Sequence, residues 1–521
     1  MSKTKSIIGG MTVLGLSGMI CKVVGVLYII PLTWLIGTDG LGIYQTVFPT
    51  YNLLLTISSA GLPVAVSRLV ATRLSKDDPR GAKNIFRTAA WLLATLGLIC
   101  TILMLAGSGF LADKVVAQPE SRLGFQVIAP CVGIVCVLSA FRGFMQGQQN
   151  MTPTAISQLI EQVGKVALAL PLAWLGSKHG VAYGAAGALL GTTIVEVLAL
   201  VYMLCLYLRS RSTFSRLEQG PDVYEGRTSA IAKHLMAISI PITIGACIVP
   251  LSQFVDSAML TKRLEVAGFS AGTALSMYGL FSGSVIRIIN IPTALALSIS
   301  MSLVPAISSA RAAGDQDMVV RQSDLGLRFA FIIGLPCSIG MSVLAEPLMR
   351  FFYEHTMTES ELLVGGQLLS LSGLTIVLFT VVQATSSILQ GLGKQRIPMY
   401  TLVAGVACKI VLNYLLVGTE QVNILGAPIA SLVCYTVSMV PNLYYVLKYA
   451  GMRINWKDWI LRPGLATAAM GIAAWALREL LPVNRLTLIV EVAAGVVVFA
   501  ACALLCKAIT REDLRAFRRR K

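Results

Sequence analysis

The sequence predicts an all-α polytopic membrane protein of about fourteen transmembrane helices, built as two six-helix lobes followed by two further helices. The first observation is compositional: 55% of the 521 residues are hydrophobic and only 13% are charged, with a mean hydropathy of +0.75. Soluble globular chains carry about 25% charged residues. The second observation is a series of long apolar stretches, and the third is an internal repeat that relates two parts of the chain.

Fourteen apolar stretches reach the length of about 20 residues that a helix needs to cross a bilayer. They fall at residues 7–36, 42–71, 88–112, 123–141, 154–176, 181–208, 235–260, 275–304, 329–349, 364–389, 398–417, 424–447, 460–481 and 486–506. The first is too long for a signal-peptide core and lacks a small-x-small cleavage site, so we interpret it as a transmembrane helix. The eighth is interrupted by Arg287, Asn290 and Pro292.

Polar residues recur along the chain at a nearly constant offset. Gln146 and Gln390 are 244 positions apart, and so are Lys165 and Lys409. The dipeptide Gly184-Ala185 recurs 242 positions later. An offset shared by separate places predicts a duplicated six-helix unit, and substrate sites of duplicated transporters lie between the repeats.

The repeat also predicts how the chain is divided. We expect an N-lobe at residues 1–208, a C-lobe at residues 235–450, and a cytoplasmic linker at the polar residues 209–234 between them. Residues 451–521 fall outside the duplication and hold the last two helices and a basic cytoplasmic tail.

The basic residues alternate with the predicted topology. If the N-terminus is cytoplasmic, the inner segments hold 29 Lys and Arg and the outer segments hold 8, counting span-end residues with the adjoining loop. This bias predicts that both termini are cytoplasmic. It also accounts for the net charge of +17 without a nucleic-acid partner, because the basic residues face an anionic membrane leaflet.

The sequence contains no pattern typical of a metal site or of an enzyme. Its eleven cysteines are scattered through apolar stretches without a CxxC pair, and its three histidines fall in predicted loops. It has no P-loop or glycine-rich nucleotide fingerprint. We therefore expect no disulfide framework, no metal, no cofactor and no enzymatic activity.

Two cations lie deep within predicted spans, where a charge costs at least about 2.5–3.5 kcal/mol. Lys22 is midway along the first span, and Arg287 is within the eighth. One interpretation is a cationic site for an anionic head group, in which Arg287 offers a bidentate fork to phosphate. The other is a structural ion pair with Asp256 or Glu196, or snorkelling to the membrane interface.

The fifth span carries a second group of polar residues. Glu161 and Lys165 are spaced i, i+4 in the favourable order, with Gln158 and Gln162 close by. The pair could line a cavity wall, or it could neutralise itself and pack the helix. Lys409 has no acidic neighbour in its own span, which favours a cavity or an interhelical partner.

Three stretches resemble a known group of transporters: AGLPVAVSRLVA (60–71), FRGFMQGQQNMTPTAISQLIEQVGK (141–165) and NIPTALALSISMSLVPAIS (290–308). They are similar to the stage V sporulation protein B group, in the polysaccharide-transporter branch of the MOP exporter superfamily, alongside the MurJ-type lipid II flippases. The resemblance extends over essentially all 521 residues.

The resemblance implies two six-helix lobes in a V around a central cavity, with two extra helices forming a groove for a lipid tail. It implies a bacterial cell membrane and a polyprenyl-diphosphate-linked saccharide as cargo. Membrane lipids and proteins of cell-wall synthesis are its expected partners. Coupling to Na⁺ and coupling to H⁺ both stay open.

Lys22 and Arg287 stand where the MurJ-type pattern has basic residues on the first and eighth helices. Other positions depart from that pattern. Tyr28-Ile29 replace an arginine followed by an aspartate, and Ile286 and Asn290 occupy the acidic positions that flank Arg287. A polyprenyl-linked saccharide is therefore a firmer expectation than lipid II itself.

The sequence thus predicts a flippase that works by alternating access and serves cell-wall or spore-cortex peptidoglycan synthesis. Its expected cavity residues are Lys22, Glu161, Lys165, Asp256, Arg287, Asn290 and Lys409. One alternative is a MATE-like multidrug or cation-coupled exporter, which would use cavity carboxylates. Another is a non-transporting scaffold for cell-wall enzymes, in which substituting the intramembrane charges would be harmless.

Overall fold

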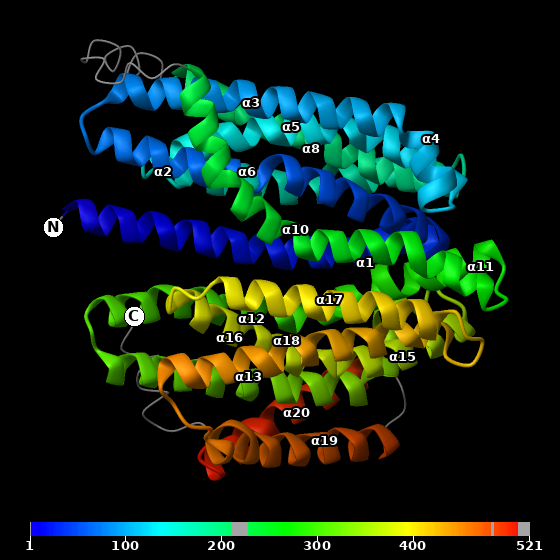
Figure 1. Cartoon of the computed structure of the whole chain (residues 1–521). Helices are drawn as coiled ribbons and strands as arrows, with labels where there is room; N and C mark the ends of the chain where they lie inside the picture. Colours follow the sequence, from blue (N-terminus) through cyan, green and yellow to red (C-terminus); the bar gives the residue numbers. More distant parts are fainter. Residues whose placement is uncertain (1, 210–227, 481–483, 509–521) are drawn as a thin grey trace. The chain divides into compact units, whose positions relative to one another are not determined.

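The computed structural model describes residues 2–209, 228–480 and 484–508, except for the side chains of residues 2–20, 22–23, 26, 241, 295–299, 301–302 and 485. The described residues form helices and no strand (Figure 1). Helices are expected for an apolar chain in a membrane, because a helix satisfies its backbone hydrogen bonds within one segment. The all-α prediction is confirmed.

The helices group into two compact units. One comprises Met1–Lys262 and Ser270–Gly279, and the other comprises Arg263–Phe269 and Leu280–Lys521. We call them the N-terminal and C-terminal units and describe each by itself. The predicted lobe boundary within residues 209–234 rests on the repeat and lies largely outside the described residues.

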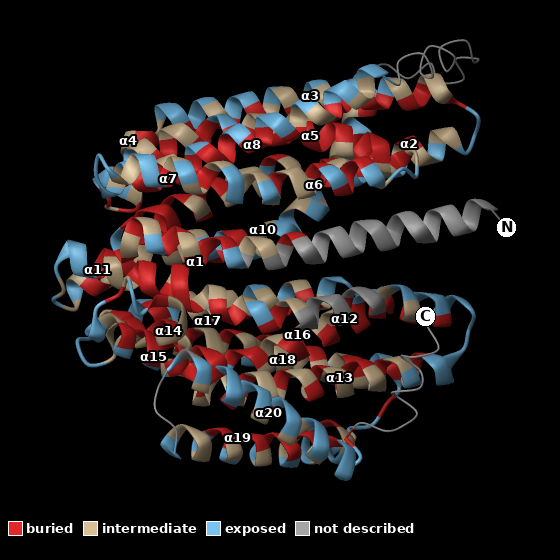
Figure 2. Ribbon diagram, turned by 180° about the vertical axis from the view of Figure 1, so that it is seen from behind, coloured by how far each residue is buried: buried red, intermediate tan, exposed pale blue. Residues whose placement is uncertain are grey.

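The N-terminal unit contains helices that cross its length and short turns that join them. They are α1 (Ser2–Ser59), α2 (Leu62–Leu74), α3 (Pro79–Ala106), α4 (Ser108–Phe110), η1 (Leu111–Val115), η2 (Pro119–Ser121), α5 (Arg122–Gly147), α6 (Thr152–Gly164), η3 (Lys165–Ala169), α7 (Leu170–Ser177), α8 (Val181–Arg209), α10 (Thr228–Val266, whose last turn passes into the other unit) and α11 (Ala271–Tyr278). Helix α5 is the most buried and packs against α1, α2, α3 and α8 (Figure 2).

The C-terminal unit repeats this arrangement and adds two helices. Its elements are η4 (Gly279–Val285), α12 (Ile286–Ala312), α13 (Gln316–Val343), α14 (Ala345–Tyr353), α15 (Glu359–Gly373), α16 (Thr375–Gly391), α17 (Arg396–Val417), η5 (Asn423–Leu425), α18 (Gly426–Ala450), η6 (Lys457–Leu461), α19 (Arg462–Leu480) and α20 (Arg485–Leu505). Helix α16 packs against α12, α13 and α18, as α5 packs against α2, α3 and α8.

Thirteen segments of the described chain are long and apolar enough to cross a membrane. The first of them, Leu27–Leu74, has 48 residues, more than twice the crossing length of about 20. It contains a break at Gly37, whose φ of 68° is readily reached by glycine. This break separates the first two predicted spans, and each of the other twelve segments overlaps one predicted span. The prediction of about fourteen helices therefore agrees with the structure.

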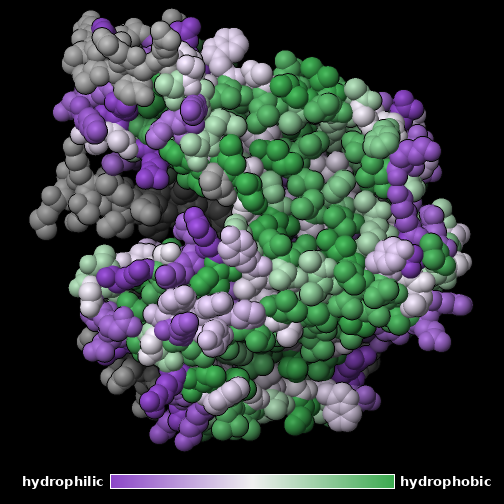
Figure 3. All heavy atoms as spheres, viewed as in Figure 1, coloured by the Kyte–Doolittle hydropathy of each residue, from purple (hydrophilic) through white to green (hydrophobic). Residues whose placement is uncertain are grey.

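Polar groups at the helix ends fix where several spans begin. Asp78 accepts the Gly81 amide at 2.8 Å and caps α3, and Thr358 with Glu361 forms a capping box on α15. On the face shown in Figure 3, hydrophobic residues cover the middle and hydrophilic residues gather toward the two sides at which the helices end. This distribution is the one that a bilayer-spanning protein requires.

The last two helices are fixed to the C-terminal unit by polar contacts as well as by packing. Trp459 Nε1 donates to Asp324 Oδ1 at 2.8 Å, and Arg478 donates to Glu346 Oε2 at 2.9 Å. The Arg328 guanidinium donates to the Ala508 carbonyl. Helices α19 and α20 pack on each other, and α19 packs on α13.

Candidate functional site

A group of intramembrane charges among the described residues lies in the N-terminal unit, where α5, α6 and α8 meet. We call it the charged network: Arg142, Glu161, Lys165 and Glu196, with Ser157. Arg142 forms an ion pair with Glu161 and donates from Nε to Ser157 Oγ at 2.9 Å. Lys165 Nζ lies 3.9 Å from Glu196 Oε1. Each of the two basic side chains is thus paired with one carboxyl group.

Close helix packing brings the second ion pair together. A Cβ atom added at Gly164 would lie 2.6 Å from Val195 Cγ1, and one added at Gly191 would lie 2.3 Å from Ala169 Cα. Neither contact leaves room for a side chain, so these glycines allow α6 and η3 to approach α8 closely. Lys165 follows Gly164 and Glu196 follows Val195, which places the two charges opposite each other.

The i, i+4 pairing of Glu161 with Lys165 is corrected by the structure. Among the described residues, each forms its ion pair across helices, Glu161 with Arg142 and Lys165 with Glu196. The Lys165 amide still donates to the Glu161 carbonyl, so the helical turn between the two residues is intact, and the π-helical turn η3 begins only at Lys165. Because each residue is paired across helices, Glu161 and Lys165 do not neutralise each other within one helix.

The network is shielded from solvent but is not sealed. The exposed fractions of the side chains are 14% for Arg142, 12% for Glu161, 19% for Lys165 and 5% for Glu196. Within the described chain, Glu196 Oε2 is buried without a hydrogen-bond partner. A separation of 3.9 Å exceeds hydrogen-bonding distance, so Lys165 is held by charge more than by geometry.

Two amides on α6 extend the polar surface. Gln158 Oε1 is buried without a hydrogen-bond partner among the described residues. Gln162 Oε1 lies 3.1 Å from the position that a Cβ atom of Gly25 would occupy. Gly25, on α1, therefore leaves room for the side-chain amide of Gln162, on α6. Lys22 lies one helical turn earlier in α1, and its side chain is outside the described residues.

The other predicted site residues lie elsewhere in the fold. Asp256 is half-buried on α10 of the N-terminal unit. Arg287 and Asn290 are half-buried in the first turns of α12, and Lys409 is half-buried on α17, all in the C-terminal unit. The structure joins Glu161 and Lys165 in one network, and the facing of Lys22 and Arg287 across a cavity stays a prediction.

Sequence reasoning missed the role of Arg142, which it assigned to a loop after a span ending at residue 141. Helix α5 continues to Gly147, so Arg142 is helical and directed at α6. A usable signal was present: no other charged residue occurs between Arg122 and Glu161, and Glu196 is likewise the only carboxylate in its helix. Lone intramembrane charges of opposite sign are expected to pair.

A protein-family model described as polysaccharide biosynthesis protein matches residues 7–311, more than half of the chain. The chain belongs to this family. A second model, MatE, matches residues 241–415. The resemblance noted in the sequence is thereby confirmed.

Individual relatives match along nearly the whole chain. Stage V sporulation protein B of Bacillus subtilis (strain 168) is 25% identical over 509 residues, covering 97% of this chain and 96% of that protein. Lipid II flippase MurJ of the same organism is 25% identical over 491 residues, covering 90% of this chain and 88% of that protein. A solved structure of the lipid II flippase MurJ in an inward closed conformation superposes with a TM-score of 0.72 at 13% identity, covering 94% of this chain and 97% of that one. The fold is therefore shared with MurJ.

Proposed function

We propose that this chain is a flippase that carries a polyprenyl-diphosphate-linked saccharide from the inner to the outer leaflet of a bacterial cell membrane. The observation that carries the proposal is the alignment of 90% of the chain with a lipid II flippase. A flippase cargo of this kind would supply cell-wall or spore-cortex peptidoglycan synthesis. The similarity to stage V sporulation protein B supports a role in spore-cortex synthesis rather than in cell-wall synthesis.

The proposed cargo site uses cations to replace the hydration of a diphosphate. Lys22 and Arg287 would bind the diphosphate, because charge-assisted hydrogen bonds are roughly twice as strong as neutral ones. Glu161, Lys165 and Lys409 would line the wall of the hydrated cavity that holds the saccharide, together with Asp256 and Asn290. The polyprenyl tail would lie on α19 and α20, whose exposed surface is rich in Ile, Leu and Val.

The direction of transport follows from electrostatics. We place both termini on the cytoplasmic side, as the basic residues of the inner loops favour. An inside-negative potential then drives an anionic cargo outward by about 2.3 kcal/mol per charge per 100 mV. Alternating access needs no resident cofactor in this scheme.

The MatE match over residues 241–415 favours a second candidate, a cation-coupled multidrug exporter. Such an exporter would select cations, and its essential groups would be carboxylates such as Asp256 rather than Arg287. The two candidates therefore differ in the sign of the cargo and in the residues that they need.

Transport in vesicles distinguishes the candidates. The full chain is reconstituted in liposomes with a fluorescent polyprenyl-diphosphate saccharide, and access of an external quencher reports the leaflet of the label. We expect the protein to speed equilibration between the leaflets, and a cationic dye to be left unmoved. Dye export without saccharide flipping would favour the exporter and reject the flippase.

A further inference from the structure

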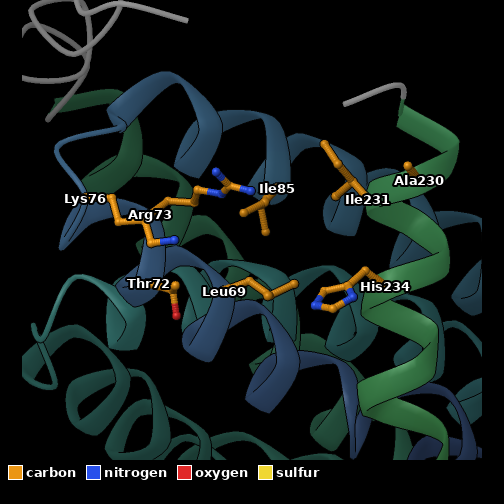
Figure 4. A pocket seen from close by; sticks show the side chains of 8 residues that line it. All are labelled: Leu69, Thr72, Arg73, Lys76, Ile85, Ala230, Ile231 and His234. Atoms are coloured by element: carbon orange, nitrogen blue, oxygen red, sulfur yellow. The ribbon is translucent and has the colours of Figure 1, made fainter. Parts of the chain in front are cut away.

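A second candidate site is a cavity of about 340 Å³ in the N-terminal unit, away from the charged network. It lies among the end of α2, the first turns of α3 and the beginning of α10 (Figure 4). Its lining residues are Leu69, Thr72, Arg73, Lys76, Ile85, Ala230, Ile231 and His234. Its volume is at the lower end of the range of about 300–1,000 Å³ typical of ligand sites, which suits a head group rather than a whole lipid.

The cavity is positively charged. Arg73 and Lys76 lie on one side and His234 on the opposite side (Figure 4). Among the eight described lining residues none carries a carboxylate. The buried Asp78 lies 3.4 Å from Arg73, but its Oδ1 also caps α3, so its charge is shared with the helix end. Asp77 is exposed on the adjoining turn and does not line the cavity.

The cavity also has an apolar part. Leu69, Ile85 and Ile231 line it alongside the cations. Helix α2 ends the membrane crossing Leu27–Leu74, and α3 begins the crossing Pro79–Ala106, so the cavity lies at the ends of two spans. The basic bias of the loops assigns this end to the cytoplasmic side.

We propose that this cavity binds the phosphate of an anionic phospholipid of the inner leaflet. Arg73 and Lys76 contact the phosphate, His234 supplies a further hydrogen-bond donor, and the first chain carbons pack on Leu69 and Ile231. Cations above an apolar surface between transmembrane helices are the arrangement that recognises anionic lipid head groups. A soluble phosphate would gain nothing from the apolar part, so we commit to the lipid. The proposal does not rest on the flippase assignment.

Calorimetric titration of the purified full chain in detergent tests the proposal. The probes are dihexanoyl-phosphatidylglycerol, dihexanoyl-phosphatidylcholine and inorganic phosphate. We expect phosphatidylglycerol to bind more than about tenfold more tightly than either of the others, because only it combines a net negative charge with acyl chains. Equal affinity for phosphatidylcholine would overturn charge recognition, and equal affinity for inorganic phosphate would overturn the lipid as ligand.

Variants locate the binding. Lys76 is exposed, so Lys76→Gln should fold normally and weaken phosphatidylglycerol binding by about fivefold, equivalent to about 1 kcal/mol per lysine at 1.4 kcal/mol per tenfold. Ala230→Phe fills the cavity without changing its charge and should abolish binding. Lys233→Gln is the matched control, because Lys233 is exposed on α10 and does not line the cavity. Equal weakening by Lys76→Gln and Lys233→Gln would show general attraction to a basic face and overturn the site.

Discussion

In the N-terminal unit, α5, α6 and α8 are joined by two ion pairs, whereas the corresponding helices of the C-terminal unit are joined by hydroxyl and amide groups. At the repeat offset of 244, Ser386 replaces Arg142 and Gly405 replaces Glu161; at the offset of 242, Ser438 replaces Glu196. Lys409 keeps the position of Lys165.

The second half fills the same interface with short polar contacts. Ser438 Oγ donates to the Thr401 carbonyl at 3.2 Å, and Thr401 Oγ1 donates to Asn442 Oδ1 at 2.8 Å. Asn442 Nδ2 in turn lies 3.4 Å from Ser386 Oγ. A Cβ atom at Gly405 would lie 2.5 Å from both Ser438 Oγ and the Cys434 carbonyl, so this interface is also closely packed.

The comparison shows that a duplicated backbone does not require duplicated electrostatics. The printed contacts across the N-terminal interface join charged groups, and those across the C-terminal interface join neutral groups. A charged interface is costly to disturb, because removing one partner leaves a buried charge. The N-terminal interface should therefore be the more sensitive to the loss of a single polar side chain.

The largest effect is expected for the Arg142–Glu161 pair. Glu161→Gln leaves the buried guanidinium without its counter-charge and should lower the free energy of unfolding by about 3–5 kcal/mol. Adding Arg142→Met to Glu161→Gln should restore much of this loss. Thermal unfolding in detergent measures both variants. Wild-type stability of Glu161→Gln alone would contradict the ion pair.

A smaller loss of stability is expected when the Lys165–Glu196 pair is broken. Lys165→Met leaves Glu196 without a cation and should cost about 2–3 kcal/mol, less than the first pair, because the 3.9 Å separation involves no hydrogen bond. Adding Glu196→Gln to Lys165→Met should restore part of the lost stability, because no buried carboxylate is then left without a cation. If the double variant is no more stable than Lys165→Met, the two residues are not coupled.

Replacing a close-packed glycine by alanine should cost different amounts of stability in the two units. Gly405→Ala should cost about 1–2 kcal/mol, because its Cβ would meet the Cys434 carbonyl, which cannot move without the backbone. Gly164→Ala should cost less, since its nearest neighbour is the end of the Val195 side chain. Gly464→Ala in α19 is the control: nothing lies within 4 Å of its Cβ position. A ranking in which Gly464→Ala is the most harmful would refute this packing.

The smallest effect is expected for the neutral contacts of the C-terminal unit. Ser386→Ala removes one weak contact to Asn442 and should cost about 0.6 kcal/mol, the average for hydrogen bonds between membrane helices. The measurement is the same thermal unfolding. A loss as large as that of Glu161→Gln would remove the contrast between the two interfaces.

Much of the fold could be predicted from local sequence. Apolar runs located the spans, because each run lies within a short window, and the offset between Gln146 and Gln390 indicated the duplication, because a repeat can be found by comparing the sequence with itself. The pairing of Glu161 with Arg142 could not be read in this way. It depends on how α5 and α6 are rotated against each other, and no local pattern encodes that rotation. The eighth span shows a second limit of hydropathy patterns. Its polar residues Arg287 and Asn290 interrupt an apolar run, but they do not interrupt the helix α12.

Leaflet-resolved flipping by Arg287 variants tests the central claim most directly. Initial rates of polyprenyl-diphosphate saccharide flipping are compared in vesicles for wild type, Arg287→Ala, Arg287→Lys and Arg321→Ala, an exposed arginine on α13 that serves as the control. We predict that Arg287→Ala abolishes flipping while reconstituted abundance is unchanged. Arg287→Lys should retain part of the rate, because a bidentate fork becomes a point charge, and Arg321→Ala should be indistinguishable from wild type. Wild-type flipping by Arg287→Ala would contradict the claim that this chain moves its cargo through a cationic diphosphate site.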